Sequence, residues 1–319
     1  MGACRETKVD GVERDAEVER ALLGLVPAPT QPGTVFVVGG PRTGSTLLYQ
    51  MLALAARLPF VSNLANANYP HAPIVGIALQ RGAPSKFALE SEYGKTRGAF
   101  APSEASAVMR QWCGGDHPSQ SRSACVIPGR EDHMRRTLAC AELLFDGRPM
   151  VIKNPWNCFR VRSLAAALPS SRFVWIRRDP RAAAASDLAA RRVTKGNETD
   201  WNSATPSNVD ELRRLPPVAQ VVENQFEFSL AVESALAQLP ASQWTEVWYE
   251  DLVADPASRI AALCVTLGLG EWLRPDSGII SGVHGESRPG VDSAAIGAYV
   301  AAHRERLARF LRPESCGQP

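Results

Sequence analysis

Apolar residues gather in short runs along this chain, and longer segments with helical spacing separate the runs. The runs lie at residues 35–38, 150–152, 173–176 and 244–249, and the first three are almost continuously apolar. Such runs are typical of strands buried on both faces, and strands that alternate with helices are typical of a parallel sheet. The pattern predicts an α/β fold, a three-layer α/β/α sandwich with a central parallel sheet.

The rest of the pattern predicts one more strand, at residues 58–64, and a series of helices. Helices are expected at residues 12–26, 71–81, 103–112, 130–145, 157–168, 180–192, 209–239 (part-interrupted by Pro216 and Pro217) and 295–311, and one more from residue 256. Proline and glycine between residues 27 and 33 mark a linker after the first helix. We therefore expect an N-terminal helix and linker (1–33) followed by a single domain (34–319).

Composition narrows the class of protein. The 319 residues include 35 basic and 33 acidic side chains, a net charge of +2, so the chain as a whole is not built to bind nucleic acid. No apolar run approaches the roughly 18–20 residues of a membrane helix, and the polar N-terminus lacks the apolar core of a secretory signal. The seven cysteines form no CxxC pair, which favours reduced thiols. We expect a cytoplasmic protein without membrane insertion.

The stretch after the first strand has the form of a phosphate-binding loop. Residues 35–52 read VFVVGGPRTGSTLLYQML, a buried strand, a glycine-bearing turn and the start of a helix. In that arrangement the backbone N–H groups and the helix dipole favour an anion. Gly39 and Gly44 have the spacing of a P-loop, but Ser45 stands where a P-loop carries lysine. The fixed cation is instead Arg42, inside the loop, and the expected fold is P-loop-like.

Functional groups follow each strand of the expected sheet. Arg42 comes after the first strand, Lys153 and Arg178 after the next two, and Tyr249 at the end of the last. Ligands of parallel α/β folds bind at the carboxyl ends of the strands. Ser186 stands eight residues after Arg178, where a guanidinium and a hydroxyl can clamp a phosphate. Two separate anion sites suggest a nucleotide that carries phosphates at both ends.

Taken in order, these motifs resemble the sulfotransferase family that uses 3′-phosphoadenosine 5′-phosphosulfate (PAPS). The loop GGPRTGSTLL is similar to its 5′-phosphosulfate loop, in the form seen in protein-tyrosine and bacterial sulfotransferases. The stretch FVWIRRDPRAAAAS resembles its 3′-phosphate motif, VIKNP its lysine-bearing strand end, and TEVWYEDLVADP its tyrosine-containing segment. The four motifs span residues 35–256, which is most of the chain.

The resemblance implies a binding site for PAPS, with 3′,5′-adenosine bisphosphate (PAP) as the product. The implied donor-binding residues are Gly40, Pro41, Arg42, Thr43, Gly44, Ser45 and Thr46 for the 5′-phosphosulfate, Arg178 and Ser186 for the 3′-phosphate, and Tyr249 for the nucleotide. The family's C-terminal Arg-Lys-Gly motif is absent, and Ser287 and Arg288, in the loop at residues 281–294, are expected to replace it.

The chemistry of sulfuryl transfer fits the cations of these motifs. Negative charge grows on the bridging oxygen and the 5′-phosphate of the donor, so Arg42 and Lys153 would stabilise the transition state more than the ground state. No metal is required for this, and none of the five histidines pairs with another at ligand spacing. We therefore expect a metal-independent site.

Transfer also needs a base for the acceptor proton. Glu104, in the APSE segment, is the first candidate because similar bacterial sulfotransferases carry an acidic residue there. The alternative reading of Glu104 is an acid in the first turn of a helix, which satisfies the helix dipole. His71, with a side chain suited to the role, is the second candidate, and His117 and Glu90 follow.

Two other functions remain open at this point: a P-loop small-molecule kinase and a nucleotide-binding protein without catalysis. The missing P-loop lysine argues against the kinase, and a second cation at Lys153 argues against a simple binder. Residues 63–128 and 194–215 are polar and irregular with scattered aromatic side chains, and we expect them to bind the acceptor. They suit a hydroxyl or amine of a small organic molecule, such as a carbohydrate, lipid or natural product.

Overall fold

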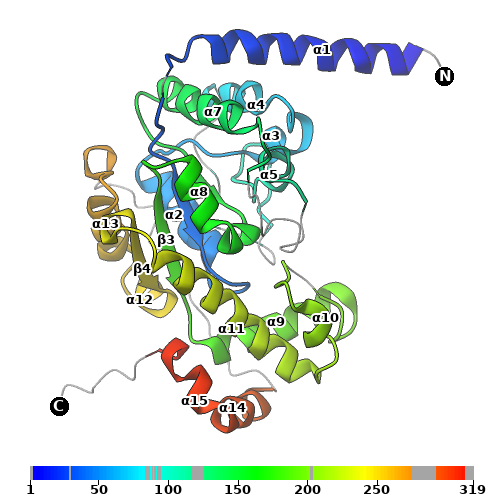
Figure 1. The fold of residues 1–319 in the computed structure, drawn as a ribbon, viewed down its shortest axis with the longest axis vertical. Helices are drawn as coiled ribbons and strands as arrows, with labels where there is room; N and C mark the ends of the chain where they lie inside the picture. Colours follow the sequence, from blue (N-terminus) through cyan, green and yellow to red (C-terminus); the bar gives the residue numbers. More distant parts are fainter. Residues whose placement is uncertain are drawn as a thin grey trace.

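A parallel four-stranded sheet forms the centre of the protein (Figure 1). The computed structural model describes residues 3–28, 30–82, 87, 89, 91, 95–115, 126–201, 204–274 and 292–312. Within these residues the strands are β1 (Val35–Val38), β2 (Val151–Lys153), β3 (Arg172–Arg177) and β4 (Trp244–Trp248), in the spatial order β2-β1-β3-β4. The first strand in the sequence therefore has a neighbour on each side.

Alternate residues of β1 face opposite sides of the sheet, and both sides are covered. Val35 and Val37 belong to one apolar cluster, and Phe36 and Val38 belong to another. All four side chains are almost completely buried. Burial on both faces explains why β1 is continuously apolar. The predicted fold class, a P-loop-like α/β/α sandwich with a parallel sheet, is confirmed.

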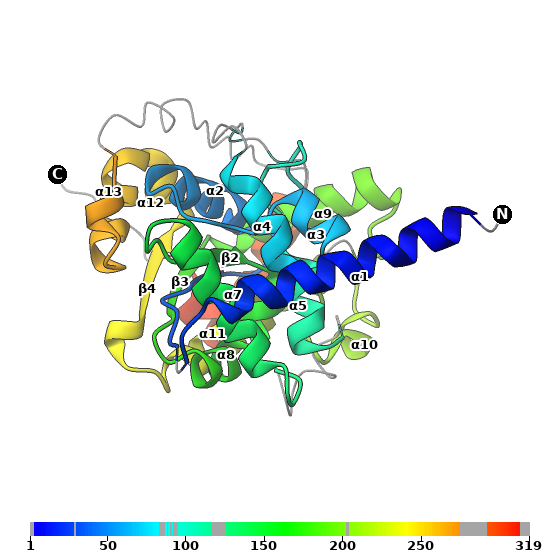
Figure 2. The same ribbon diagram turned by 90° about the horizontal axis from the view of Figure 1, so that it is seen from above.

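Helices cover both faces of the sheet and extend beyond its edge (Figure 2). The cluster on the Val35 face includes α2 (Ser45–Ala55), α12 (Tyr249–Ala254) and α13 (Pro256–Thr266). The cluster on the Phe36 face includes α4 (Pro73–Arg81), α5 (Ser106–Cys113), α7 (Glu131–Leu144), α8 (Val161–Ala167) and α11 (Pro217–Leu236). A third cluster joins α9 (Pro180–Lys195), α11, α14 (Ser293–Ala302) and α15 (Arg304–Leu307).

Shorter elements complete the described part of the chain. They are α3 (Asn63–Asn68), α10 (Val209–Leu212), and the 3-10 helices η1 (Pro155–Phe159), η2 (Ala241–Gln243), η3 (Gly270–Trp272) and η5 (Ala308–Phe310). Among the helices that the structure describes, none combines the length and the apolar character needed to cross a membrane.

The first helix, α1 (Ala3–Gly24), projects from the body of the molecule (Figure 2). It begins nine residues earlier than the pattern predicted. Glu19, near its inner end, accepts hydrogen bonds from the backbone N–H groups of Ile74 and Val75 at the start of α4. The division into an N-terminal helix with linker (1–33) and one domain (34–319) stays a prediction.

The strand predicted at residues 58–64 is wrong. Residues 58–64 form no strand: the carbonyl of Pro59 accepts a hydrogen bond from Val151, but Ser62 then caps α3 with its side chain. The short polar helix that follows removes the rest of the segment from the sheet. The interruption expected at Pro216 and Pro217 within residues 209–239 is confirmed: α10 ends at Leu212 and α11 begins at Pro217, which has no N–H to continue a helix.

Candidate active site

The loop between β1 and α2 has a backbone shaped for an anion. Arg42 and Gly44 both lie in the left-handed region, with φ of 64° and 88°, and the Thr43 hydroxyl donates to the carbonyl of Gly40 at 2.7 Å. The helix that follows has no side-chain cap and no acidic residue in its first turn. The first N–H groups of a helix have no intrahelical acceptor. In α2 they therefore face the concave side of the loop, where an anion is favoured.

Side chains from two distant elements hold this loop from behind. The Gln225 amide of α11 donates to the carbonyl of Pro41 at 2.9 Å. The thiol of Cys158 accepts from the N–H of Gly39 and donates to its carbonyl, both at 3.2 Å. Sequence reasoning missed both residues. The signal that could have identified Gln225 is its place among polar residues in the buried part of an otherwise apolar helix.

On one flank of the loop, Arg178 follows β3 and points back toward the loop. Its guanidinium donates to the carbonyl of Arg42 at 2.9 Å and stacks on the ring of Tyr249 at 4.5 Å. That ring lies so close to Gly44 that a Cβ there would be 2.3 Å from it. Arg42 in turn donates through Nε to the Ser186 hydroxyl at 3.1 Å. The structure therefore brings all five predicted donor residues of this flank together.

On the other flank, β2 places Lys153 beside the loop. Lys153 pairs with Val37 in the register of β1 and β2, two residues before Gly39. Its ammonium contacts the carboxylate of Glu104, and the lysine side chain is 7% exposed whereas the glutamate side chain is 36% exposed. Glu104 lies before the start of α5, so the reading of Glu104 as a first-turn helix acid is wrong. The carboxylate faces the loop, and a second molecule can reach it.

One cavity of about 200 Å³ joins the two flanks. Arg42, Arg178 and Tyr249 line it from one side, and Lys153 and Glu104 from the other. The loop residues Gly40, Pro41, Gly44, Ser45 and Thr46 form its floor, and sequence reasoning missed three further lining residues, Leu47, Ser91 and Pro155. Three cations and a helix N-terminus therefore surround one carboxylate, an arrangement that favours the binding of an anion.

Of the other predicted residues that the structure describes, His71, Thr43 and Ser186 do not line this cavity. His71 is exposed at the turn before α4, a helix whose first N–H groups bind Glu19 of α1. The candidates Glu90, His117, Ser287 and Arg288 lie outside the described residues. Among the residues that are described, no group of three histidine, cysteine, aspartate or glutamate side chains could hold a metal ion.

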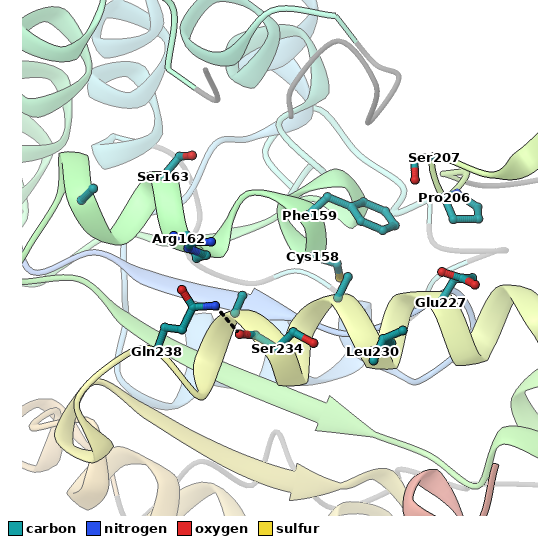
Figure 3. Close-up of a pocket in the computed structure, with 13 residues that line it drawn as sticks. Cys158, Phe159, Arg162, Ser163, Pro206, Ser207, Glu227, Leu230, Ser234 and Gln238 are labelled. Atoms are coloured by element: carbon teal, nitrogen blue, oxygen red, sulfur yellow. Dashed lines mark hydrogen bonds between the residues drawn. The ribbon is translucent and has the colours of Figure 1, made fainter. Parts of the chain in front are cut away.

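A larger cavity, of about 630 Å³, lies between α8 and α11 (Figure 3). Arg162 of α8 lies near Gln238 and Ser234 at one end of the cavity, and Glu227 of α11 lies near Pro206 and Ser207 at the other. Cys158 borders this cavity, but burial raises the pKa of its thiol to about 12, which keeps it protonated. None of the predicted site residues lines this cavity. The candidate active site is therefore the smaller cavity at the loop.

Parts of the sequence match known proteins. The sequence matches the profile of the sulfotransferase family over residues 32–273. Two curated relatives are the omega-hydroxy-beta-dihydromenaquinone-9 sulfotransferases Stf3 of Mycobacterium bovis and Mycobacterium tuberculosis, each 25% identical over 150 residues. These matches cover 46% of this chain and 36% of each relative, so the chain aligns with about a third of their length.

Solved structures share the fold over a larger part of the chain. The sulfotransferase STF1 from Mycobacterium tuberculosis aligns with a TM-score of 0.59 at 18% identity, covering 93% of this chain and 81% of that one. The sulfotransferase STF9 from Mycobacterium avium aligns with a TM-score of 0.50 at 15% identity, covering 92% and 72%. Because the family profile matches most of its sequence, this chain belongs to the sulfotransferase family.

Proposed function

We propose that this protein transfers the sulfuryl group of PAPS to a hydroxyl or amine of a small organic acceptor. The observation that carries the proposal is the Lys153–Glu104 pair at the mouth of a phosphate loop that lacks the P-loop lysine. This transfer requires a cation near the leaving phosphate and a carboxylate that takes the acceptor proton. The pair supplies both groups at one point of the site.

The donor set around the cavity fits PAPS. The N-terminus of α2 and the loop residues would bind the 5′-phosphosulfate. Arg178 and Ser186 would bind the 3′-phosphate, and the ring of Tyr249 would lie against the nucleotide. Arg42 contacts Ser186 and also lines the loop cavity, so it stands between the two anion positions. Arginine suits this place because its planar guanidinium presents several N–H donors in a fixed geometry.

The donor supplies an activated sulfuryl group, and this chain supplies charge and a base. Lys153 and Arg42 would stabilise the negative charge that grows on the phosphate as the bond to sulfur breaks. Glu104 would take the proton from the acceptor oxygen or nitrogen as that atom bonds to sulfur. The transferred group leaves as a sulfate ester or sulfamate, the proton stays on Glu104, and PAP remains in the donor site.

The acids near the other strand ends argue against the kinase alternative. Kinases hold magnesium with carboxylates at such positions. Asp179, after β3, binds Arg181 through both oxygens, and although burial opposes ionisation, Arg181 lowers the pKa of Asp179. Glu250, after β4, accepts a hydrogen bond from the N–H of Asp179. Both carboxylates therefore serve the loop after β3.

The acceptor class rests on the sequence of residues 63–128 and 194–215, in which polar stretches join the short helices α3, α4, α5 and α10. They favour a carbohydrate, a lipid or a natural product over a nucleic acid or a polyanionic glycan. The buried free thiols Cys113, Cys140, Cys158 and Cys264 fit a reducing compartment, so we place the activity in the cytoplasm.

A screen of small-molecule acceptors with ³⁵S-labelled PAPS tests this function. We expect label to move to a hydroxylated or amine-bearing acceptor in the presence of a metal chelator. Magnesium-dependent transfer of the γ-phosphate of ATP would instead establish the kinase. Tight binding of PAP with no transfer to any acceptor or to water would establish a non-catalytic binder.

A further inference from the structure

Two consecutive residues at the end of β2, Lys153 and Asn154, contact the side chain and the main chain of Glu104. Lys153 contacts its carboxylate. The side-chain amide of Asn154 donates to the main-chain carbonyl of Glu104 at 2.9 Å and to the Ser106 hydroxyl at 3.3 Å. Asn154 is 1% exposed. The oxygen of its side-chain amide also caps η1 by accepting from the N–H of Trp156 at 3.0 Å. One buried asparagine thus joins the phosphate-loop edge of the sheet to the segment that carries the base.

The segment that carries Glu104 has an unusual backbone. Ala105 lies in the left-handed region with φ of 54°, a conformation that costs energy for any residue with a Cβ. The Ser103 hydroxyl accepts from the N–H of Ala105 at 2.9 Å, and the N–H of Ser103 donates to Val61 at 2.8 Å. Such strain persists only where surrounding contacts determine the conformation.

Without those contacts, the local sequence favours a different conformation. Ser103 followed by Glu104 is a typical helix start, and the sequence pattern predicted a helix from Ser103. The observed α5 begins three residues later, at Ser106. A helix that began at Ser103 would turn the carbonyl of Glu104 into the helix and move its carboxylate with the first turn. The contact from Asn154 to that carbonyl opposes this change.

We infer that Asn154 is a positioning residue that holds Glu104 at the sulfuryl position. The inference rests on the proposed function only for what Glu104 does there; the clamp itself is a property of the fold. Burial raises the pKa of the Tyr49 phenol well above its usual value, and the charge of Glu104 raises it further, so this phenol stays neutral.

Asn154→Ser tests the clamp while it keeps the cap of η1. Serine retains an oxygen for the N–H of Trp156 but is too short to reach Glu104. We expect a crystal structure of this variant to show Glu104 displaced from Lys153. We also expect hydrolysis of ³⁵S-labelled PAPS, in which water is the acceptor, to slow by about 10- to 100-fold, with PAP affinity changed by less than about twofold. Asn157→Ala is the matched control, since Asn157 is a fully buried asparagine of η1 whose side chain has no hydrogen-bond partner among the residues that the structure describes.

A double-mutant cycle shows whether Asn154 acts through Glu104. Glu104→Gln alone should slow the reaction by about 10²- to 10⁴-fold, and adding Asn154→Ser to it should change the rate by less than about threefold. Independent, additive losses would show a merely structural role and overturn the inference, as would a variant structure that keeps the Lys153–Glu104 contact. If Glu104→Gln retains full activity, the proposed base is wrong. The crystal structure of Asn154→Ser still shows whether Asn154 holds Glu104 in place.

Discussion

The two flanks of the phosphate loop are built in different ways. On the β3 side, Arg178 binds the loop backbone at Arg42 and stacks on Tyr249, and Arg42 reaches Ser186. On the β2 side, Lys153 is almost buried and contacts a carboxylate from a segment 49 residues away in sequence. The first flank consists of cations that contact the loop, whereas the second consists of a lysine and a carboxylate that contact each other.

This difference assigns separate tasks to the flanks. Cations that already share contacts with the loop lose little freedom when an anion arrives, so the β3 flank suits donor binding. A lysine that contacts a carboxylate gains less from a ground-state anion, and its charge is most useful where charge grows during the reaction. We therefore expect substitutions on the β3 flank to weaken donor binding and those on the β2 flank to slow transfer.

The largest effect is expected from Lys153→Ala. Loss of one preorganised cation at developing charge should slow sulfuryl transfer by about 10²- to 10³-fold, while PAP affinity changes by less than about tenfold. Single-turnover transfer of ³⁵S label measures the first quantity and calorimetry the second. Lys195→Ala, at the exposed end of α9, is the control. Near-normal turnover in Lys153→Ala would remove the β2 flank from the chemistry.

A smaller effect, on binding, is expected from Arg178→Ala. Loss of a charged hydrogen-bond donor costs about 1.5–3 kcal/mol, so PAP affinity should fall by about 10- to 100-fold with little change in the single-turnover rate at saturating donor. The neighbouring Arg177 is a matched control because it lies between Trp175 and Trp248 and contacts Glu246 instead of the loop. Equal losses in both variants would contradict the assignment of Arg178.

Gly44→Ala tests the contact between the loop and Tyr249. The new Cβ would lie 2.3 Å from the ring, and φ is 88°. We expect a loss of about 1–2 kcal/mol of stability from the backbone alone, and a donor affinity reduced by about tenfold as the ring is displaced. Thermal unfolding and PAP titration measure these. Gly297→Ala, in α14 with no atom of the described residues within 4 Å of its Cβ, should be neutral or stabilising by about 0.5–1 kcal/mol; a similar loss there would contradict this account.

The smallest effect is expected at Glu142, outside both flanks. Burial raises the pKa of the Glu142 carboxyl to about 7, although the N–H of Gly33 donates to it at 2.6 Å. The folded state therefore favours the protonated acid, and stability present below pH 4.5 is lost as the pH rises through about 7. Relative to Glu142→Gln, the unfolding temperature of the wild type should fall by a few degrees between pH 5 and pH 8. The same pH dependence of the unfolding temperature in both proteins would contradict the raised pKa of Glu142.

The sequence predicts the β3 flank better than the β2 flank, for a physical reason. The loop, Arg178 and Tyr249 follow directly from strands whose apolar runs are plain in the sequence, and parallel strands bring their carboxyl ends to one edge. Lys153 is found in the same way. Their positions depend on local sequence and on one rule of topology.

Glu104 and its clamp depend on contacts between distant segments, which local patterns do not show. The local sequence favours a helix start at Ser103, and only the structure shows the hydrogen bond from Asn154 to Glu104 and the left-handed Ala105 that stand there instead. Gln225 and Cys158 likewise act on the loop from 184 and 119 residues away. The strand expected at residues 58–64 fails for a local reason, since the Ser62 side chain caps the start of α3 by accepting from the N–H of Ala65.

Calorimetric titration with PAP in the presence of EDTA tests the division of tasks most directly. The wild-type protein should bind PAP without metal, Arg178→Ala should bind about 10- to 100-fold more weakly, and Lys153→Ala should stay within about tenfold of the wild type. Binding of ATP that requires magnesium, with no binding of PAP, would contradict the donor assignment. Equal losses of PAP affinity in the two variants would contradict the separation of the flanks.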